Sequence, residues 1–140
     1  MRMRRVGVIA MVCGIVATAA HAADVKVTVE RVPNAHGKVH VDICDEAKFL
    51  GPDCVYDASM PAHRGRVTVT VRNVPPGRYA AVAYHDENAN NDLDLNALGM
   101  PREPYGFSNE PPMLMGPPLF KDAAFEVKDQ DVALTIKLKR

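Results

Sequence analysis

The feature that most constrains the fold is a regular alternation of apolar and polar residues in several short segments. In VKVTVERV, residues 25–32, valine occupies every second position at first, and KVHVDIC, RVTVTVRNV and DVALTIKLKR repeat the pattern. Successive side chains of a β-strand point to opposite faces, so a period of two predicts strands with one buried face. The apolar sets are Val25, Val27 and Val29; Val39, Val41 and Ile43; Val67, Val69 and Val71; and Leu134, Ile136 and Leu138.

Two further segments complete the predicted architecture. RYAAVAYH, residues 78–85, has small and apolar residues on both faces, which is typical of a central strand between two layers. DAAFEVKD, residues 122–129, also reads as a strand, and no segment has a sustained helical period. Six or seven short strands joined by glycine and proline turns predict an all-β protein, an antiparallel β-sandwich.

The segment that begins the chain, residues 1–22, has the composition of a secretory signal. A basic start, MRMRR, precedes a short apolar run, and Ala20 and Ala22 flank His21 in an A-x-A arrangement that is typical just before a cleavage point. We predict cleavage after Ala22, a single domain over residues 23–140, and a periplasmic or secreted location. The apolar run is short for a bilayer span of roughly 20 residues, so we expect no stable membrane span after cleavage.

The charge and cysteine content of the chain limit the classes of partner and the cellular compartment that we expect. Lys and Arg together number 17, as do Asp and Glu; cleavage after Ala22 removes three arginines and no acidic residue, which leaves a net charge of −3. That balance lacks the basic excess of a nucleic-acid binder, and we predict no nucleic-acid partner. Cys44 and Cys54 are the two cysteines that remain, and in an oxidising compartment an even pair predicts a disulfide.

A long segment without alternation, residues 85–120, interrupts the strand pattern and contains six of the 11 prolines. Structureless connections of this length are uncommon in compact domains and are usually functional or disordered. We predict that this one is ordered and packs on the sandwich, because it offers much apolar surface. Its large apolar residues are Leu95, Leu98, Met100, Tyr105, Phe107, Met113, Leu114, Met115, Leu119 and Phe120.

Several blocks of the chain resemble a known family. HDENANNDLDLNALGMPREPYGFSN, with NVPPGRYAAVAYHDEN before it and GPPLFKDAAFEV after it, resembles the bacterial exported family called domain of unknown function 2141. The resemblance covers nearly all of the chain after the signal segment. It implies a β-sandwich of transthyretin-like or immunoglobulin-like type, and it leaves the activity open.

The stretch HDENANNDLD contains the sharpest candidate site, which we name the acidic loop, residues 86–94. Oxygen-bearing side chains occupy every second position of the loop: Asp86, Asn88, Asn90, Asp92 and Asp94. This is the ligand spacing of the first half of an EF-hand, and calcium takes six to eight oxygen ligands. Asn91 stands where an EF-hand has glycine, although asparagine tolerates the left-handed conformation, and Ala97 stands where the bidentate glutamate belongs. A replacement ligand would come from Glu87, Asn96, Glu103, a carbonyl or water.

Three other interpretations of these residues remain open. Aspartate and asparagine also cap turns by accepting hydrogen bonds from their own backbone, without any metal. Imidazole and thioether groups suit copper, so a copper-handling site is an alternative; its residues would be His36, His40, His63 and His85 with Met60, Met113 and Met115. A small hydrolase using His85 and Ser108 is another, but Ser108 lies in no nucleophile motif. Nor does IKLKR match the Tyr-Arg-Gly-Ser ending of transthyretin-like hydrolases, and we assign no catalytic residue.

The YGFSN block also has two interpretations. Tyr105, Phe107, Ser108 and Asn109, with His85, could line a groove for a ligand or a protein partner, since binding residues often lie on loops over a rigid scaffold. The aromatic residues could instead fasten the loop to the core, with Gly106 permitting a bend. We expect a non-enzymatic binding or structural module of unknown ligand, with calcium in the acidic loop as the one candidate cofactor.

Overall fold

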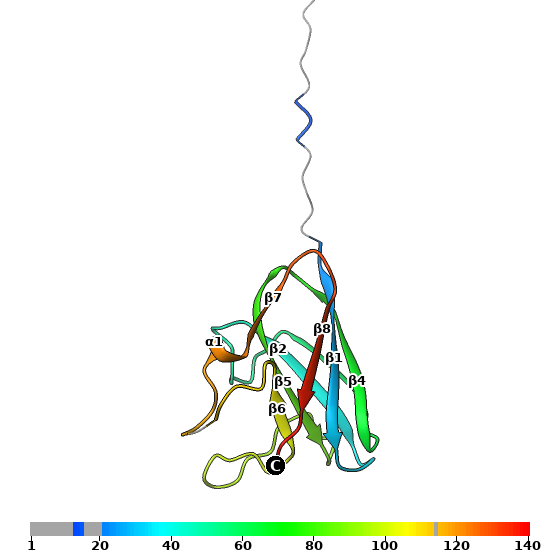
Figure 1. Ribbon diagram of the computed structural model, residues 1–140, viewed down its shortest axis with the longest axis vertical. Coiled ribbons are helices and arrows are strands. Elements are labelled where there is room, and N and C mark those ends of the chain that lie inside the picture. Colours follow the sequence, from blue (N-terminus) through cyan, green and yellow to red (C-terminus); the bar gives the residue numbers. More distant parts are fainter. Residues whose placement is uncertain (1–12, 16–20, 114) are drawn as a thin grey trace, which may run out of the picture.

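The computed structural model describes residues 13–15, 21–113 and 115–140. Most of the predicted signal segment, residues 1–22, lies outside the described residues. The described chain from Ala23 onward forms eight strands and one short helix (Figure 1). In chain order they are β1 (Ala23–Val32), β2 (Lys38–Cys44), β3 (Tyr56–Pro61), β4 (Gly65–Val74), β5 (Gly77–Asp86), β6 (Tyr105–Phe107), α1 (Phe120–Ala123), β7 (Ala124–Val127) and β8 (Val132–Lys137).

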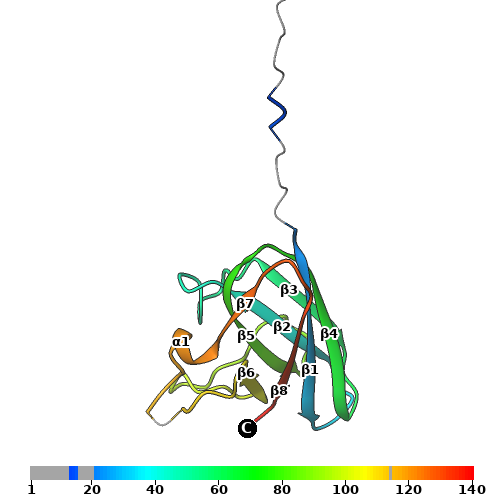
Figure 2. The same ribbon diagram turned by 45° about the horizontal axis from the view of Figure 1, so that its top comes forward.

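The strands form two sheets, which confirms the predicted all-β sandwich (Figures 1 and 2). One sheet has the order β4-β1-β8, and the other has the order β3-β2-β5-β6 with β7 also paired to β5. All pairs are antiparallel except β1 with β8, which run parallel with Val25 opposite Val132. A parallel pair needs a long crossover connection, and here nearly the whole domain separates the two strands.

The predicted apolar faces meet between the two sheets. The valine sets of β1 and β4, and the Val39, Val41 and Ile43 set of β2, are all buried in one continuous core. Ile136 and Leu138 are buried as predicted, whereas Leu134 is only partly buried. The period of two therefore identified the interior face of the strands correctly.

The long segment contains more regular structure than the sequence predicts. It includes β6, which pairs with β5, and its last residue begins α1. Phe107 and Phe120 are buried in a second, smaller cluster with Ala80 and Ala123. The segment therefore does pack on the sandwich, although Leu98 is 87% and Met115 is 100% exposed, and residue 114 lies outside the described residues.

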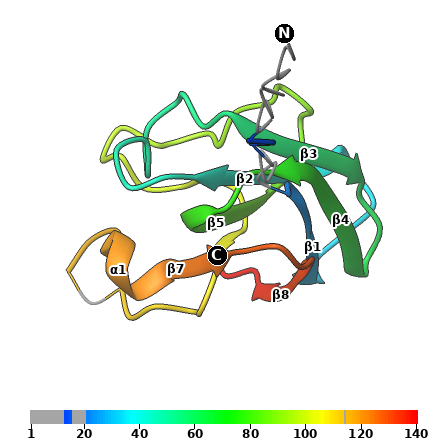
Figure 3. The same cartoon turned by 90° about the horizontal axis from the view of Figure 1, so that it is seen from above.

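The predicted disulfide between Cys44 and Cys54 is present. It closes the excursion that follows β2, and this excursion carries Phe49 to the second cluster. The Phe49 ring lies edge-on to Phe107 and Phe120, with centroid distances of 6.0 and 5.7 Å. The cross-link thus helps to hold an aromatic contact over the end of the five-stranded sheet where α1 and β7 lie (Figure 3).

Candidate functional site

The acidic loop begins where β5 ends, and Asp86 is its innermost residue. The Asp86 side chain is 0% exposed. Its two carboxylate oxygens accept hydrogen bonds from the backbone N–H groups of Asn90, at 3.1 Å, and Asn91, at 2.8 Å. Asn91 has φ of 66°, so it does adopt the left-handed conformation that asparagine tolerates. Asp86 therefore caps the first turn of the loop.

Three side chains of the loop converge on one another at its exposed side. The Nδ2 atoms of Asn88 and Asn90 donate to the two carboxylate oxygens of Asp94, at 2.6 and 2.7 Å. The Oδ1 atoms of these asparagines accept from the backbone N–H groups of Asn90, at 3.3 Å, and Asp92, at 3.0 Å. The side chains of Asn88, Asn90 and Asp94 thus form a network of hydrogen bonds within one turn, at the surface of the protein.

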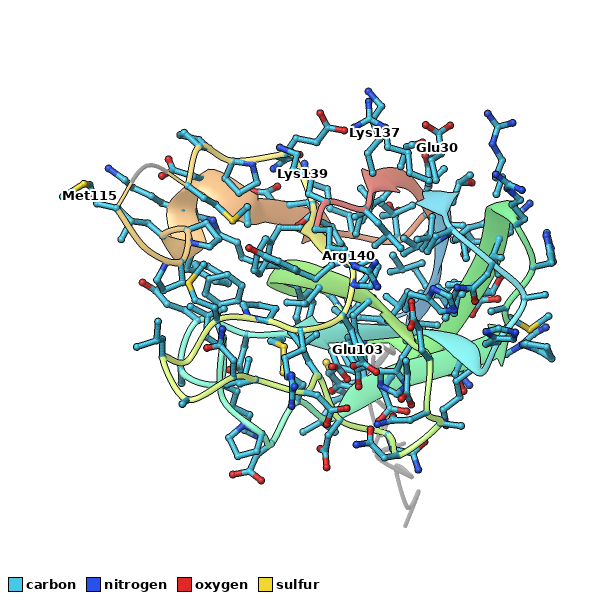
Figure 4. The ribbon with its side chains drawn as sticks, turned by 90° about the horizontal axis from the view of Figure 1, so that it is seen from below. Glu30, Glu103, Met115, Lys137, Lys139 and Arg140 are labelled. Carbon is cyan, nitrogen blue, oxygen red and sulfur yellow. A yellow bond between two sulfur atoms is a disulfide. The ribbon has the colours of Figure 1, made fainter. Side chains whose placement is uncertain are left out.

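Glu103 brings the proline-rich segment back to the acidic loop. Its side chain is 6% exposed, and its carboxylate accepts hydrogen bonds from the N–H groups of Glu87, at 3.1 Å, and Asp94, at 3.2 Å. Burial, together with the charges of Asp94 and Asp86, raises the pKa of Glu103 above its ordinary value, although the two N–H groups oppose this. In Figure 4, Glu103 lies among oxygen-tipped side chains, away from Lys137 and Lys139.

The loop is fastened to the outer face of the five-stranded sheet by Tyr84. The Tyr84 hydroxyl donates to the backbone oxygen of Asn91 at 3.1 Å, and Lys38 donates to the Asn91 side chain. Burial and then the carboxylate of Asp42, with smaller effects of Asp86, Asp92 and Glu103, raise the pKa of Tyr84 well above its ordinary value. Tyr84 therefore stays a hydrogen-bond donor at neutral pH, in a region of concentrated negative charge.

His85 points away from this face, toward the interior. It is 0% exposed, its Nε2 lies 2.6 Å from the backbone oxygen of His36, and its Nδ1 lies 3.7 Å from a carboxylate oxygen of Glu87. The remaining residues of the copper alternative differ in burial: His36, His63, Met60 and Met115 are exposed, Met113 is partly buried, and His40 is buried.

The YGFSN block closes a gap along one edge of β5. β6 pairs with the second half of β5 and β7 with the first half. Between them, the Ser108 hydroxyl accepts from the Ala81 N–H at 2.9 Å and donates to the Ala123 oxygen at 2.5 Å. The Asn109 amide likewise donates to the Ala124 oxygen at 2.8 Å. Ser108 is buried, and these hydrogen bonds connect the end of β6 to the start of β7.

The two aromatic residues of the block and Gly106 have related roles. Phe107 is buried in the second cluster, and Tyr105 lies partly buried beside it with a centroid distance of 5.9 Å. A Cβ atom on Gly106 would lie 2.7 Å from Ile136 Cγ2 and from the Lys137 carbonyl oxygen. Gly106 thus allows β6 to approach β8 closely; a bend is not the reason for glycine here, since Gly106 lies inside a strand.

One group of ligand-type side chains was not predicted from the sequence. Ligand atoms of His40, Asp42 and Asp57 all lie within 4.8 Å of one another, and this is the one such group of three His, Cys, Asp or Glu residues within the described part of the chain. The alternation of β2 placed His40 and Asp42 on its polar face. Asp57 was missed because residues 56–61 were not recognised as a strand, and no sequence signal gives their register with β2.

Comparison with known proteins identifies a family and no individual relative. A family model described as "Uncharacterized protein conserved in bacteria (DUF2141)" matches residues 27–135, well over half of the chain. No curated protein and no solved structure matches the chain. Within the described residues, no helix is long and apolar enough to cross a membrane.

Proposed function

The chain belongs to the bacterial family DUF2141, and we propose that it is an exported, non-enzymatic β-sandwich module that binds calcium in its acidic loop. The observation that carries the calcium proposal is that the side chains of Asn88, Asn90 and Asp94 meet within the acidic loop. Both ends of this loop are held by hydrogen bonds from the backbone to the Glu103 carboxylate. The ligand or protein partner of the module as a whole stays undefined.

The hydrogen bonds of the loop are compatible with a second, cation-bound arrangement. The two ends of an asparagine amide differ only in being a donor or an acceptor, so a half-turn of the amide exchanges them. Rotating the Asn88 and Asn90 amides would turn their oxygens toward Asp94, at the cost of the hydrogen bonds that these oxygens accept from the N–H groups of Asn90 and Asp92. Calcium would then replace the two N–H donors as the partner of the Asp94 carboxylate, and the exposed Asp92 side chain could join it.

Glu103 supports the proposal because it brings a carboxylate to a loop that lacks the glutamate of an EF-hand. Position 12 of the EF-hand spacing is Ala97, but Glu103 reaches the loop from the proline-rich segment. Its carboxylate is buried near Asp94 and Asp86, and burial first, with the charges of these two residues, raises the pKa of Glu103. A divalent cation would neutralise such a group of carboxylates. In this proposal Asp86 is the buried capping residue, while Asn88, Asn90, Asp92, Asp94 and Glu103 face the cation.

Calcium titration of the purified protein tests the proposal. For dissociation constants of about 0.1 to 1 mM, typical of extracellular sites, 1 mM calcium should stabilise the fold by about 0.4 to 1.4 kcal/mol. The measurement is thermal unfolding in EDTA and in calcium, with magnesium as the competing ion. We expect the calcium effect to disappear in the double variant Asp92→Asn with Asp94→Asn.

The matched control is Asp129→Asn, which removes an exposed aspartate in the turn between β7 and β8. It should keep the full calcium effect. The calcium proposal is wrong if the wild-type protein shows no calcium-dependent shift, or if the loop variant and the control respond alike.

The proposal of export is supported by the composition of residues 1–22 and by the disulfide, because disulfides persist in oxidising compartments. The test is the mass and the first residue of the protein recovered from the periplasmic fraction and from the medium of a bacterial culture. We expect a chain that begins at Ala23. An unprocessed chain confined to the cytoplasm would contradict export.

A further inference from the structure

The outer face of the five-stranded sheet contains a second group of ligand-type side chains, away from the turn of the acidic loop. His40 and Asp42 are two positions apart on β2, so they lie on the same face, and His40 Nε2 is 3.0 Å from Asp42 Oδ1. Asp57 lies directly opposite Asp42 on the neighbouring strand β3. We name these three residues the β2–β3 cluster.

The charges in the β2–β3 cluster are poorly balanced in the metal-free protein. Like charges directly opposite each other on an antiparallel pair are destabilising. Among the described residues, no lysine or arginine forms a salt bridge with Asp42 or Asp57. Lys38, the nearest lysine along β2, instead donates to Asn91 of the acidic loop. A bound cation would remove this imbalance.

His40 packs against Tyr84 and has a hydrogen-bond contact at one of its two ring nitrogens. The residue is 9% exposed, and its ring lies 5.1 Å from the Tyr84 ring. Its Nε2 faces Asp42, while its Nδ1 is buried without a hydrogen-bond partner in the described part of the chain. A carboxylate only accepts hydrogen bonds, so the contact with Asp42 favours the proton on Nε2, and no contact holds a proton on Nδ1. Zinc would replace this hydrogen bond, and the Nε2 lone pair would then be directed toward an ion held by Asp42.

Solvent reaches the cluster from the side of β3. β3 is the edge strand of its sheet, Asp57 is exposed, and Asp42 is partly buried. A cation could therefore enter from the edge and meet Asp57 first, then Asp42 and His40. Three protein ligands would leave one position of a tetrahedral ion for water.

We propose that His40 Nε2, Asp42 and Asp57 bind a divalent d-block cation, zinc, at the edge of the five-stranded sheet. An imidazole nitrogen favours zinc and its neighbours over calcium, which prefers oxygen ligands alone. The site is thus chemically distinct from the acidic loop and does not depend on calcium binding there. It also differs from a copper site of histidine and methionine, because its other ligands are carboxylates.

Zinc titration of the purified protein, with its disulfide intact and after treatment with EDTA, tests this proposal. Competition against a chromophoric zinc indicator should show one zinc per chain. We expect Asp57→Asn and His40→Gln each to weaken zinc binding at least tenfold, because each removes one of three ligands. Asp57 is exposed, so Asp57→Asn should leave the fold intact, which a melting curve in EDTA checks.

Two control variants separate this site from other zinc ligands and from the acidic loop. His63→Gln removes an exposed histidine elsewhere and should leave zinc affinity unchanged, as should Asp92→Asn with Asp94→Asn. If the wild-type protein binds zinc but not calcium, the calcium proposal for the acidic loop is wrong and the zinc proposal for the β2–β3 cluster still holds. The zinc site is refuted if the wild-type protein binds no stoichiometric zinc, or if Asp57→Asn and His40→Gln both retain full affinity.

Discussion

The acidic loop and the β2–β3 cluster lie on the same face of one sheet, but they are assembled in opposite ways. The loop gathers its oxygens from nearly consecutive residues, and its side chains are already bonded to its own backbone. The cluster gathers three residues from two strands, and one of its nitrogens has no partner among the described residues. Calcium in the loop would have to replace hydrogen bonds that already hold its side chains, whereas zinc in the cluster would replace the contact between His40 and Asp42.

Asp86 and Asp57 form the sharpest contrast within this comparison. Asp86 is fully buried and accepts two backbone hydrogen bonds, whereas Asp57 is exposed and lies opposite another aspartate. Removing the first should damage the fold, and removing the second should not. Four substitutions test that contrast, from the largest expected effect to the smallest.

The largest effect is expected for Asp86→Ala. The change leaves the N–H groups of Asn90 and Asn91 without their acceptor, and hydrogen bonds to charged groups contribute about 1.5 to 3 kcal/mol each. We expect a loss of about 3 kcal/mol in the free energy of unfolding, measured by urea denaturation. Asp92→Ala, an exposed neighbour, should change it by less than about 0.5 kcal/mol. Equal effects of the two changes would contradict the capping role of Asp86.

The second largest effect is expected for Tyr84→Phe, which removes one hydrogen bond between the sheet and the acidic loop. The Tyr84 hydroxyl donates to the Asn91 oxygen, and a neutral hydrogen bond contributes about 1 kcal/mol. We expect a loss of about that size, with faster hydrogen exchange confined to residues 88–92. Zinc binding should persist, because the ring that packs on His40 remains. Uniformly faster exchange over the sheet would show that Tyr84 acts on the core instead.

A smaller effect, visible as a pH dependence, is expected from Glu103. Its pKa in the folded protein is raised by burial, so the folded state binds this proton more tightly than the unfolded state does. Stability should therefore fall as pH rises from the ordinary glutamate pKa through the raised value. Glu103→Gln should lack this part of the pH profile of the melting temperature. If calcium binds near Glu103, calcium should also flatten the profile of the wild-type protein.

The smallest effect is expected for Asp57→Asn in EDTA. Removing one of two opposed charges should leave the stability unchanged or raise it by less than about 0.5 kcal/mol. Thermal unfolding at low and high salt measures it, and the gain should shrink at high salt because exposed charges are screened. A clear loss of stability would mean that Asp57 has a structural partner and would contradict the charge imbalance of the β2–β3 cluster.

Much of the fold could be predicted because burial has a local signature in strands. The valines of β1 alternate with polar residues, and the structure buries that set of valines. The disulfide pair could be predicted because Cys44 and Cys54 are the two cysteines left after the signal segment. β6 was missed because a strand as short as Tyr105 to Phe107 cannot show a period.

The candidate sites were predictable to different degrees for the same reason. The residues of the acidic loop are contiguous, so their spacing could be recognised in the sequence. The hydrogen bonds between Asp86 and the loop backbone could not, because they depend on the turn that the chain makes. Glu103 was one of several candidates for the missing ligand, and the fold placed it against both ends of the loop. Asp57 could not be connected with His40 because the two lie on different strands, and strand register is not written in either segment.

The sequence by itself determined six of the eight strands, their buried faces, the disulfide and the presence of an acidic turn, because each depends on residues close together in the chain. The tertiary structure decided three things: that β8 runs parallel to β1, that Glu103 returns to the acidic loop, and that Asp57 lies opposite Asp42. The physical reason is that pairing between strands is set by the packing of the whole core. Local patterns state which side of a strand is buried, but not which strand lies beside it.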